Sequence, residues 1–106
     1  MKDILIGIDA GTSVIKSVAF DLKGRQLAVA STTNHYEPVG RAGSVQDLAR
    51  TWIDTAATLK QLATMINDLP SRTAGIAVTG QGDGTWMIDR DGEPVGKGWL
   101  WLDARA

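Results

Sequence analysis

The fold of this chain follows from the stretch Ile4-Leu5-Ile6-Gly7-Ile8-Asp9-Ala10-Gly11-Thr12-Ser13. The apolar residues at its start do not alternate with polar ones, which predicts a central strand over 4–9 that is covered on both faces. Residues 14–21 do alternate and predict a second strand that leaves the turn. The turn between the two strands therefore brings a carboxylate, two hydroxyls and backbone N–H groups close together.

The next segments predict that the sheet continues. Gly24 lies where a hairpin loop needs a positive φ, and the hairpin leads into a third strand over 26–33. The chain thus opens with a three-stranded antiparallel meander. Residues 34–44 contain Pro38, Gly40 and Gly43, and this composition predicts a loop.

A helix is predicted from about residue 45 to residue 67 by the helical spacing of its apolar residues. Ser44 is the expected N-cap, and Asp47 completes a variant of the capping box. The apolar stripe is wide enough to cover one face of a sheet and places Trp52 in the core. Asn67 to Pro70 end the helix.

A short apolar run at 74–79 follows the helix and predicts a strand parallel to the first, joined to it by a right-handed crossover. A glycine-rich turn, Gly80 to Gly84, comes next. Further strands are expected over 85–89 and 98–103, with a turn at Asp91-Gly92. Together these elements predict an α/β fold with a mixed sheet.

Composition excludes several classes of protein. The 106 residues fit one small domain, and a formal charge of −1 offers no basic surface for nucleic acid. With no cysteine and one histidine, His35, the chain has neither a disulfide framework nor a His-rich metal cluster. The N-terminal apolar run is too short for a signal peptide, and no window reaches the ~18 apolar residues of a membrane helix. We therefore expect a cytoplasmic protein without a membrane partner.

The C-terminal segment, residues 98–106, holds two of the four tryptophans. An aromatic, strand-like segment needs a partner layer, so we expect the protein to continue past residue 106. A terminal edge strand is the alternative. Because an unpaired strand is a template for association, a homodimer is a further expectation.

The first turn has groups that suit a phosphate. It lies at the same sheet edge as the second turn if the two preceding strands are parallel neighbours, and open α/β sheets bind ligands at that edge. Gly11 lets the backbone approach closely, N–H groups near Thr12 and Ser13 form an anion-binding nest, and Lys16 adds positive charge. Asp9 would repel a phosphate unless a hard cation lay between them, which assigns this carboxylate to Mg²⁺.

The second turn suits a hydroxylated molecule. Asp83 can accept hydrogen bonds from sugar hydroxyls, and Gln81 can both donate and accept. Gly82 and Gly84 permit close approach.

Each of these features also has a purely structural interpretation. A strand-to-turn junction rich in Asp, Gly and Thr is ordinary hairpin chemistry, and the second turn alone is a weaker signal. Lys16 can be a solvated strand residue. The tryptophans at 86, 99 and 101 belong either to the core or to the wall of a pocket, and we expect the core for at least two of them.

Taken together, the motifs resemble the amino-terminal part of the FGGY carbohydrate kinases, within the actin-like ATPase superfamily. The matching segments are Ile6–Lys16, Gly75–Gly84 and Leu100–Arg105, and the last is similar to the family's L-W-x-D-x-R segment. Three motifs in this order are far more specific than any one of them, and they span essentially the whole chain.

The resemblance implies a ribonuclease H-like domain, ATP and Mg²⁺ as co-substrates, and phosphoryl transfer to a hydroxyl of a sugar or polyol. The family's first phosphate motif corresponds to Asp9, Gly11, Thr12, Ser13 and Lys16. Its sugar-contacting turn corresponds to Gln81, Gly82 and Asp83, and its further pocket-side residues correspond to Trp101, Asp103 and Arg105.

The second turn departs from two branches of the family. Xylulose kinases carry Gln-Met-His-Gly in place of Gln81–Gly84, and glycerol kinases carry an Arg-Glu pair there. The Gln-Gly-x-Gly turn looks more like that of relatives acting on other pentuloses and on polyols such as erythritol.

Family members are also several times longer than this chain. The general-base aspartate, the second phosphate motif and the adenosine pocket are expected beyond residue 106. Residues 1–106 would then form part of the N-terminal sugar-binding domain, and they should not turn over alone, because phosphoryl transfer needs the assembled site.

A non-catalytic actin-like module, used for nucleotide sensing or assembly, is the alternative function. Gln81–Gly84 and the L-W-x-D-x-R segment discriminate between the two, because such a module has less reason to keep them.

Overall fold

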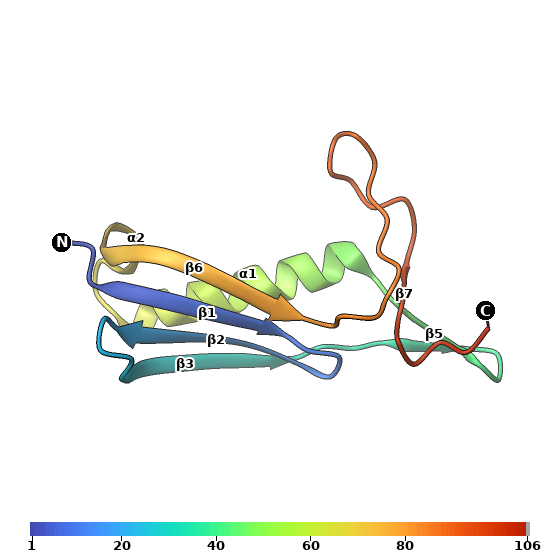
Figure 1. The fold of residues 1–106 in the computed structure, drawn as a ribbon, viewed down its shortest axis with the longest axis horizontal. Coiled ribbons are helices and arrows are strands. Elements are labelled where there is room, and N and C mark those ends of the chain that lie inside the picture. The colour runs from blue at the N-terminus through green and yellow to red at the C-terminus, as the bar shows by residue number, and fades with distance from the viewer. Residues whose placement is uncertain (106) are drawn as a thin grey trace.

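A computed structural model describes residues 1–105, in which two sheets are joined by one long helix (Figure 1). The elements in chain order are β1 (Ile4–Ala10), β2 (Val14–Asp21), β3 (Gln26–Thr33), β4 (Glu37–Val39), β5 (Gly43–Gln46), α1 (Leu48–Met65), α2 (Leu69–Arg72), β6 (Thr73–Gly80) and β7 (Gly98–Trp99). The shape is elongated, with extents of 49 × 28 × 21 Å, because the second sheet projects beyond one end of the first (Figure 1).

The main sheet has the strand order β3-β2-β1-β6. β1, β2 and β3 pair antiparallel, which confirms the predicted meander, and β6 pairs parallel to β1, which confirms the predicted crossover strand. In this parallel pair Ala10 lies opposite Gly80, so both polar turns leave the sheet at the same edge. The topology therefore places the two candidate motifs side by side.

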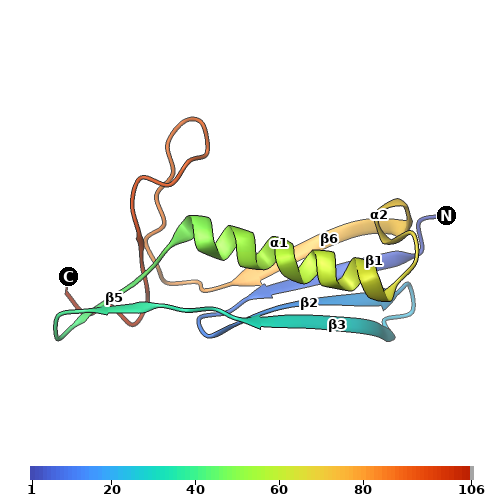
Figure 2. The ribbon, with the colours of Figure 1, turned by 180° about the vertical axis from the view of Figure 1, so that it is seen from behind.

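α1 covers one face of the main sheet (Figure 2). Beneath it the core consists largely of β1 and β2 side chains, among them the fully buried Ile4 and Ala19. The prediction that the first strand is covered on both faces is wrong for residues 1–105, since Leu5 on its other face is 43% exposed. Within residues 1–105, α1 covers one face of the main sheet, and no second layer covers the other face.

The start of α1 differs from the prediction. The helix begins at Leu48, and Asp47 is the N-cap, its side chain accepting from the Arg50 backbone N–H. Ser44 belongs to β5 and donates its backbone N–H to the Asp103 carboxylate, at 2.8 Å. Residues 45 and 46, which local spacing assigned to the helix, therefore belong to a strand that pairs with distant residues.

The buried face of α1 also differs from the predicted apolar stripe. Its buried residues are Asp54, Thr58 and Leu62, and Trp52 is 76% exposed, so the placement of Trp52 in the core is wrong. Thr58 can face the sheet because its hydroxyl meets the Ser17 hydroxyl, with 2.7 Å between the oxygens. A buried polar group that finds a partner loses little on leaving water.

The second sheet has the order β4-β5-β7 and replaces several expected features. Residues 34–44 are not simply a loop, because β4 and part of β5 form an antiparallel hairpin there. Residues 85–89 are not a strand and contribute only isolated bridges, and the strand expected over 98–103 shortens to Gly98–Trp99. The predicted turn at Asp91-Gly92 is confirmed: Gly92 has a φ of 80° and donates to the Asp89 carbonyl.

Neither helix within residues 1–105 has the length and apolar character needed to cross a membrane.

Candidate functional site

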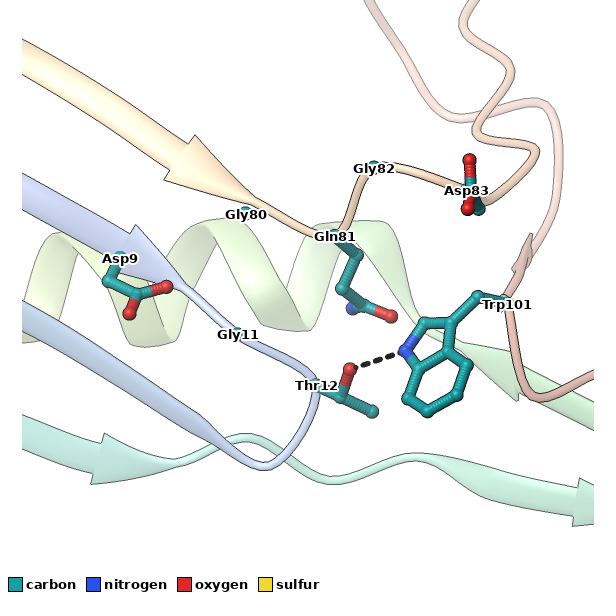
Figure 3. A pocket seen from close by; sticks show the side chains of 8 residues that line it. All are labelled: Asp9, Gly11, Thr12, Gly80, Gln81, Gly82, Asp83 and Trp101. Carbon is teal, nitrogen blue, oxygen red and sulfur yellow. Dashed lines mark hydrogen bonds between the residues drawn. The ribbon is translucent and has the colours of Figure 1, made fainter.

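A pocket of about 320 Å³ opens where β1 and β6 end (Figure 3). It is lined by Asp9, Gly11, Thr12, Gly80, Gln81, Gly82, Asp83 and Trp101. The structure thus brings together most of the site residues predicted from the sequence. Four of those residues lie outside the lining, namely Ser13, Lys16, Asp103 and Arg105.

Asp9 is exposed at the end of β1 and faces Lys16 across the antiparallel ladder. Residues directly opposite in such a ladder extend from the same face of the sheet, so the Asp9 and Lys16 side chains lie on one face. No group of three or more His, Asp or Glu side chains able to hold a metal exists within residues 1–105. Asp9 fits an ion whose other ligands are water and substrate oxygens, as Mg²⁺ prefers.

Two buried amides fix the conformation of the first turn. The Asn34 side chain donates to the Gly11 carbonyl at 2.8 Å, and the Gln46 side chain donates to the Thr12 carbonyl at 3.1 Å. In a trans peptide unit the N–H points opposite to the C=O. The N–H groups of Thr12 and Ser13 are therefore turned away from these two amides.

Gly11 is needed for the turn itself. Its N–H donates to the Val14 carbonyl, and a Cβ added at Gly11 would lie 3.0 Å from that same oxygen. The two glycines of the second turn differ from each other. A Cβ at Gly82 would meet open space, which leaves room for a ligand, whereas a Cβ at Gly84 would lie 2.5 Å from Trp86. The small size of Gly84 therefore serves the packing of Trp86.

A chain of side-chain hydrogen bonds connects the two turns. Gln81 Nε2 donates to Gln46 Oε1 at 2.9 Å, and Gln46 Nε2 donates onward to the Thr12 carbonyl. Gln46 is 1% exposed. Sequence reasoning missed Gln46 and Asn34, because helical periodicity placed Gln46 on the polar face of a helix and composition placed Asn34 in a loop.

Trp101 closes one side of the pocket. Its indole N–H donates to the Thr12 hydroxyl at 2.8 Å (Figure 3). The residue is 56% exposed. Trp99 is also exposed and Trp86 is half-buried, so the expectation that at least two of these three tryptophans are core residues is wrong. The exposure of each tryptophan depends on distant segments, so local sequence does not predict it.

Asp103 and Arg105 anchor the C-terminal segment. The Asp103 side chain is 2% exposed and accepts from the Ser44 backbone N–H and from the Arg105 guanidinium. These hydrogen bonds hold the pKa of Asp103 far below its usual range, and those from the Arg105 side chain have the largest effect. The Arg105 guanidinium lies 4.0 Å from the centre of the Trp99 ring, a cation–π contact. The pair fastens the segment that carries Trp101 to β5.

Comparison with known proteins agrees with this arrangement. Residues 4–106 match the N-terminal domain of the FGGY family of carbohydrate kinases. Over 104 residues the chain is 55% identical to an erythritol kinase from Brucella abortus, covering 98% of this chain and 20% of that protein. Over 105 residues it is 31% identical to a xylulose kinase from Staphylococcus epidermidis, covering 99% of this chain and 21% of that protein.

A solved structure has the same fold. The xylulose kinase from Rhodospirillum rubrum superposes with a TM-score of 0.88 at 26% identity, covering 96% of this chain and 21% of that one. The chain thus spans about a fifth of the length of the curated relatives it matches. Its architecture is that of the ribonuclease H-like, actin-like ATPase fold found in these sugar kinases. The family match over nearly all of its residues shows that this chain belongs to the FGGY family of carbohydrate kinases.

Proposed function

We propose that this chain is the amino-terminal part of an ATP-dependent kinase that transfers the γ-phosphoryl group of ATP to a hydroxyl of a sugar or polyol. One observation carries the proposal. A turn that carries the Asp9 carboxylate and the Thr12 hydroxyl shares one pocket with a turn rich in hydroxyl-binding groups. Phosphoryl transfer requires the phosphate and the acceptor to be held side by side.

In this proposal the first turn holds the nucleotide. Asp9 binds Mg²⁺, directly or through water, and the N–H and hydroxyl groups of Thr12 and Ser13 bind phosphate oxygens. Gly11 keeps the turn tight, and Lys16 adds positive charge from beside Asp9. Bound Mg²⁺ would neutralise charge on the phosphates, which lowers the barrier to transfer.

The second turn and Trp101 hold the acceptor. Gln81 and Asp83 bind its hydroxyls, Gly82 leaves space for it, and the Trp101 ring covers its apolar side. Asp103 and Arg105 act indirectly, by fixing the segment that carries Trp101. The name of the Brucella abortus relative, erythritol kinase, supports a polyol acceptor.

The proposal places the general base, the second phosphate motif and the adenosine pocket in parts of the protein outside residues 1–106. The kinase that carries this segment is therefore the protein to assay. We expect ADP release, coupled to a spectroscopic readout, with one or more members of a panel of tetritols, pentitols and ketoses. Absence of phosphorylation across the whole panel would overturn the assignment as a sugar or polyol kinase.

The homodimer also remains a prediction. The C-terminal strand from which it was inferred is short and pairs with β5, whereas the outer edge of β6 is unpaired within residues 1–105. Size-exclusion chromatography with light scattering on the same kinase measures its oligomeric state, and a monomer would contradict the prediction.

A further inference from the structure

The Gln81 carboxamide is held in one orientation by a hydrogen-bond chain that ends on the backbone. The Thr12 carbonyl can only accept, so the Gln46 group that contacts it, 3.1 Å away, is the Nε2 donor. Gln46 Oε1 therefore faces Gln81. An acceptor there requires a donor opposite, and Gln81 Nε2 occupies that position at 2.9 Å. One backbone carbonyl thus sets the direction of both amides.

The remaining atom of this amide is an acceptor without a partner. Gln81 Oε1 is buried and has no hydrogen-bond partner among residues 1–105. Figure 3 shows the amide extending from the end of β6 toward Thr12 and Trp101, with its oxygen on the Trp101 side. A buried acceptor left unpaired is costly, so a ligand that donates a hydrogen bond to it gains affinity.

We infer that Gln46 is a positioning residue that makes Gln81 act only as an acceptor, so that the pocket selects a ligand bearing a hydroxyl, and not a carbonyl, at the carbon that faces Gln81. This inference rests on the proposed function. It deepens that function by distinguishing polyol carbons from keto carbons within the same pocket.

The physical reason is the pairing of donors with acceptors. A hydroxyl can donate to Gln81 Oε1, whereas a carbonyl would bring two acceptors together. A free glutamine amide could rotate and present its NH₂ group to a carbonyl, but rotation here would break the bond to Gln46. The Asp83 carboxylate oxygens, which also line the pocket, are acceptors too, and this reinforces the demand for hydroxyl donors.

Substrate analogues test the inference on the unmodified full-length kinase. Each hydroxyl of the preferred substrate that is not phosphorylated is replaced in turn by hydrogen and by fluorine, and kcat/KM is measured. Fluorine accepts weakly and does not donate. We therefore expect at least one carbon at which both analogues lose about tenfold or more, since one such hydrogen bond corresponds to roughly that factor. If the fluoro analogue restored kcat/KM at every carbon where the deoxy analogue loses it, the inference would be overturned.

Variants of Gln46 locate the effect. In Gln46→Met the acceptor for Gln81 is lost at nearly constant volume, and the Gln81 amide can turn. We expect its preference for the hydroxyl substrate over the matching keto analogue to fall about tenfold or more, mainly through KM. Gln46→Glu keeps an acceptor toward Gln81 but places a second oxygen against the Thr12 carbonyl. It should therefore keep the preference while its Tm falls. Gln61→Met, at an exposed position on α1, is the matched control.

The outcomes separate a positioning role from a structural one. A preference that falls in Gln46→Met but persists in Gln46→Glu supports the inference. An unchanged preference in both variants overturns it, as does a preference that declines in step with Tm in both. Should Gln46→Met fail to fold, the analogue series on the unmodified kinase still decides. A kinase that phosphorylates no hydroxyl substrate refutes the proposed function instead.

Discussion

The main sheet and the second sheet differ in how well local sequence predicts them. The bounds of β2 and β3 coincide with those predicted from alternation and turn residues. In the second sheet, β5 and β7 are short and pair across more than fifty residues of sequence, Val45 with Trp99 and Gln46 with Gly98. The main sheet supplies the edge at which the site lies, and the second sheet supplies Gln46 and the support beneath Trp101. Long elements with a clear period can thus be predicted locally, whereas short paired strands cannot.

The largest effect that we expect comes from a change at Asp9, at the end of the main sheet where the site lies. Asp9→Asn keeps the size of the side chain and removes the charge that would hold Mg²⁺. We expect kcat of the full-length kinase to fall by roughly 100-fold or more, the scale on which metal sites lose function. Steady-state kinetics across a range of Mg²⁺ concentrations measures this. Asp91→Asn, in the exposed hairpin loop, is the control, and near-normal activity of Asp9→Asn would refute the metal assignment.

A second comparison concerns the two faces of α1. Leu62 is fully buried against the main sheet, so Leu62→Ala should lower the free energy of unfolding by about 2–5 kcal/mol. Trp52 is exposed, so Trp52→Ala should stay within about 0.5 kcal/mol. Urea denaturation of the full-length kinase measures both. Equal losses would mean that another part of the protein covers the outer face of the helix.

A third prediction concerns the polar contact under the main sheet. Thr58→Val leaves the buried Ser17 hydroxyl without its partner, and we expect a loss of about 1–3 kcal/mol in the free energy of unfolding. Replacing both residues, as Ser17→Ala with Thr58→Val, should cost less than the sum of the single changes. Thr64→Val, at an exposed position on the same helix, is the control. Additive losses would show that the two hydroxyls do not interact.

The smallest expected effect compares two carboxylates at different pH. Hydrogen bonds lower the pKa of both Asp103, in the C-terminal segment, and Asp21, in the β2–β3 hairpin. A lowered pKa in the folded state stabilises the protein above the usual carboxyl value of 3.8, and this contribution is lost as the pH falls below that value.

The Tm difference between the unmodified protein and Asp103→Asn should therefore be greatest near neutral pH and shrink below about pH 4. Asp21→Asn should show the same trend with a smaller difference, since its partner Arg25 is largely exposed and salt bridges in water contribute little. Thermal unfolding from pH 7 to pH 3 measures both variants. A difference for Asp103→Asn that grows toward low pH would contradict the assignment.

The residues of the candidate site, like the elements of the fold, divide into those that local sequence predicts and those that it does not. Residues that belong to a turn after a strand, such as Asp9, Thr12 and Gln81, were identified from sequence, because the strand pattern and the turn composition are both local. Asn34 and Gln46 were not identified, since their roles come from hydrogen bonds to backbone carbonyls far away in sequence. Asp103 was identified only by resemblance, and its contact with β5 is evident only from the hydrogen bond that it accepts from the Ser44 backbone N–H.

The sequence by itself determined the strands of the main sheet, the parallel crossover and the two turns that line the candidate site. These depend on side-chain periodicity and on the backbone freedom of glycine, both of which are properties of neighbouring residues. Only the tertiary structure decided which face of α1 is buried, how β5 pairs with β7, and which way the Gln81 amide points. Each of these depends on polar groups that find their partners only when distant segments meet, and no local pattern records those partners.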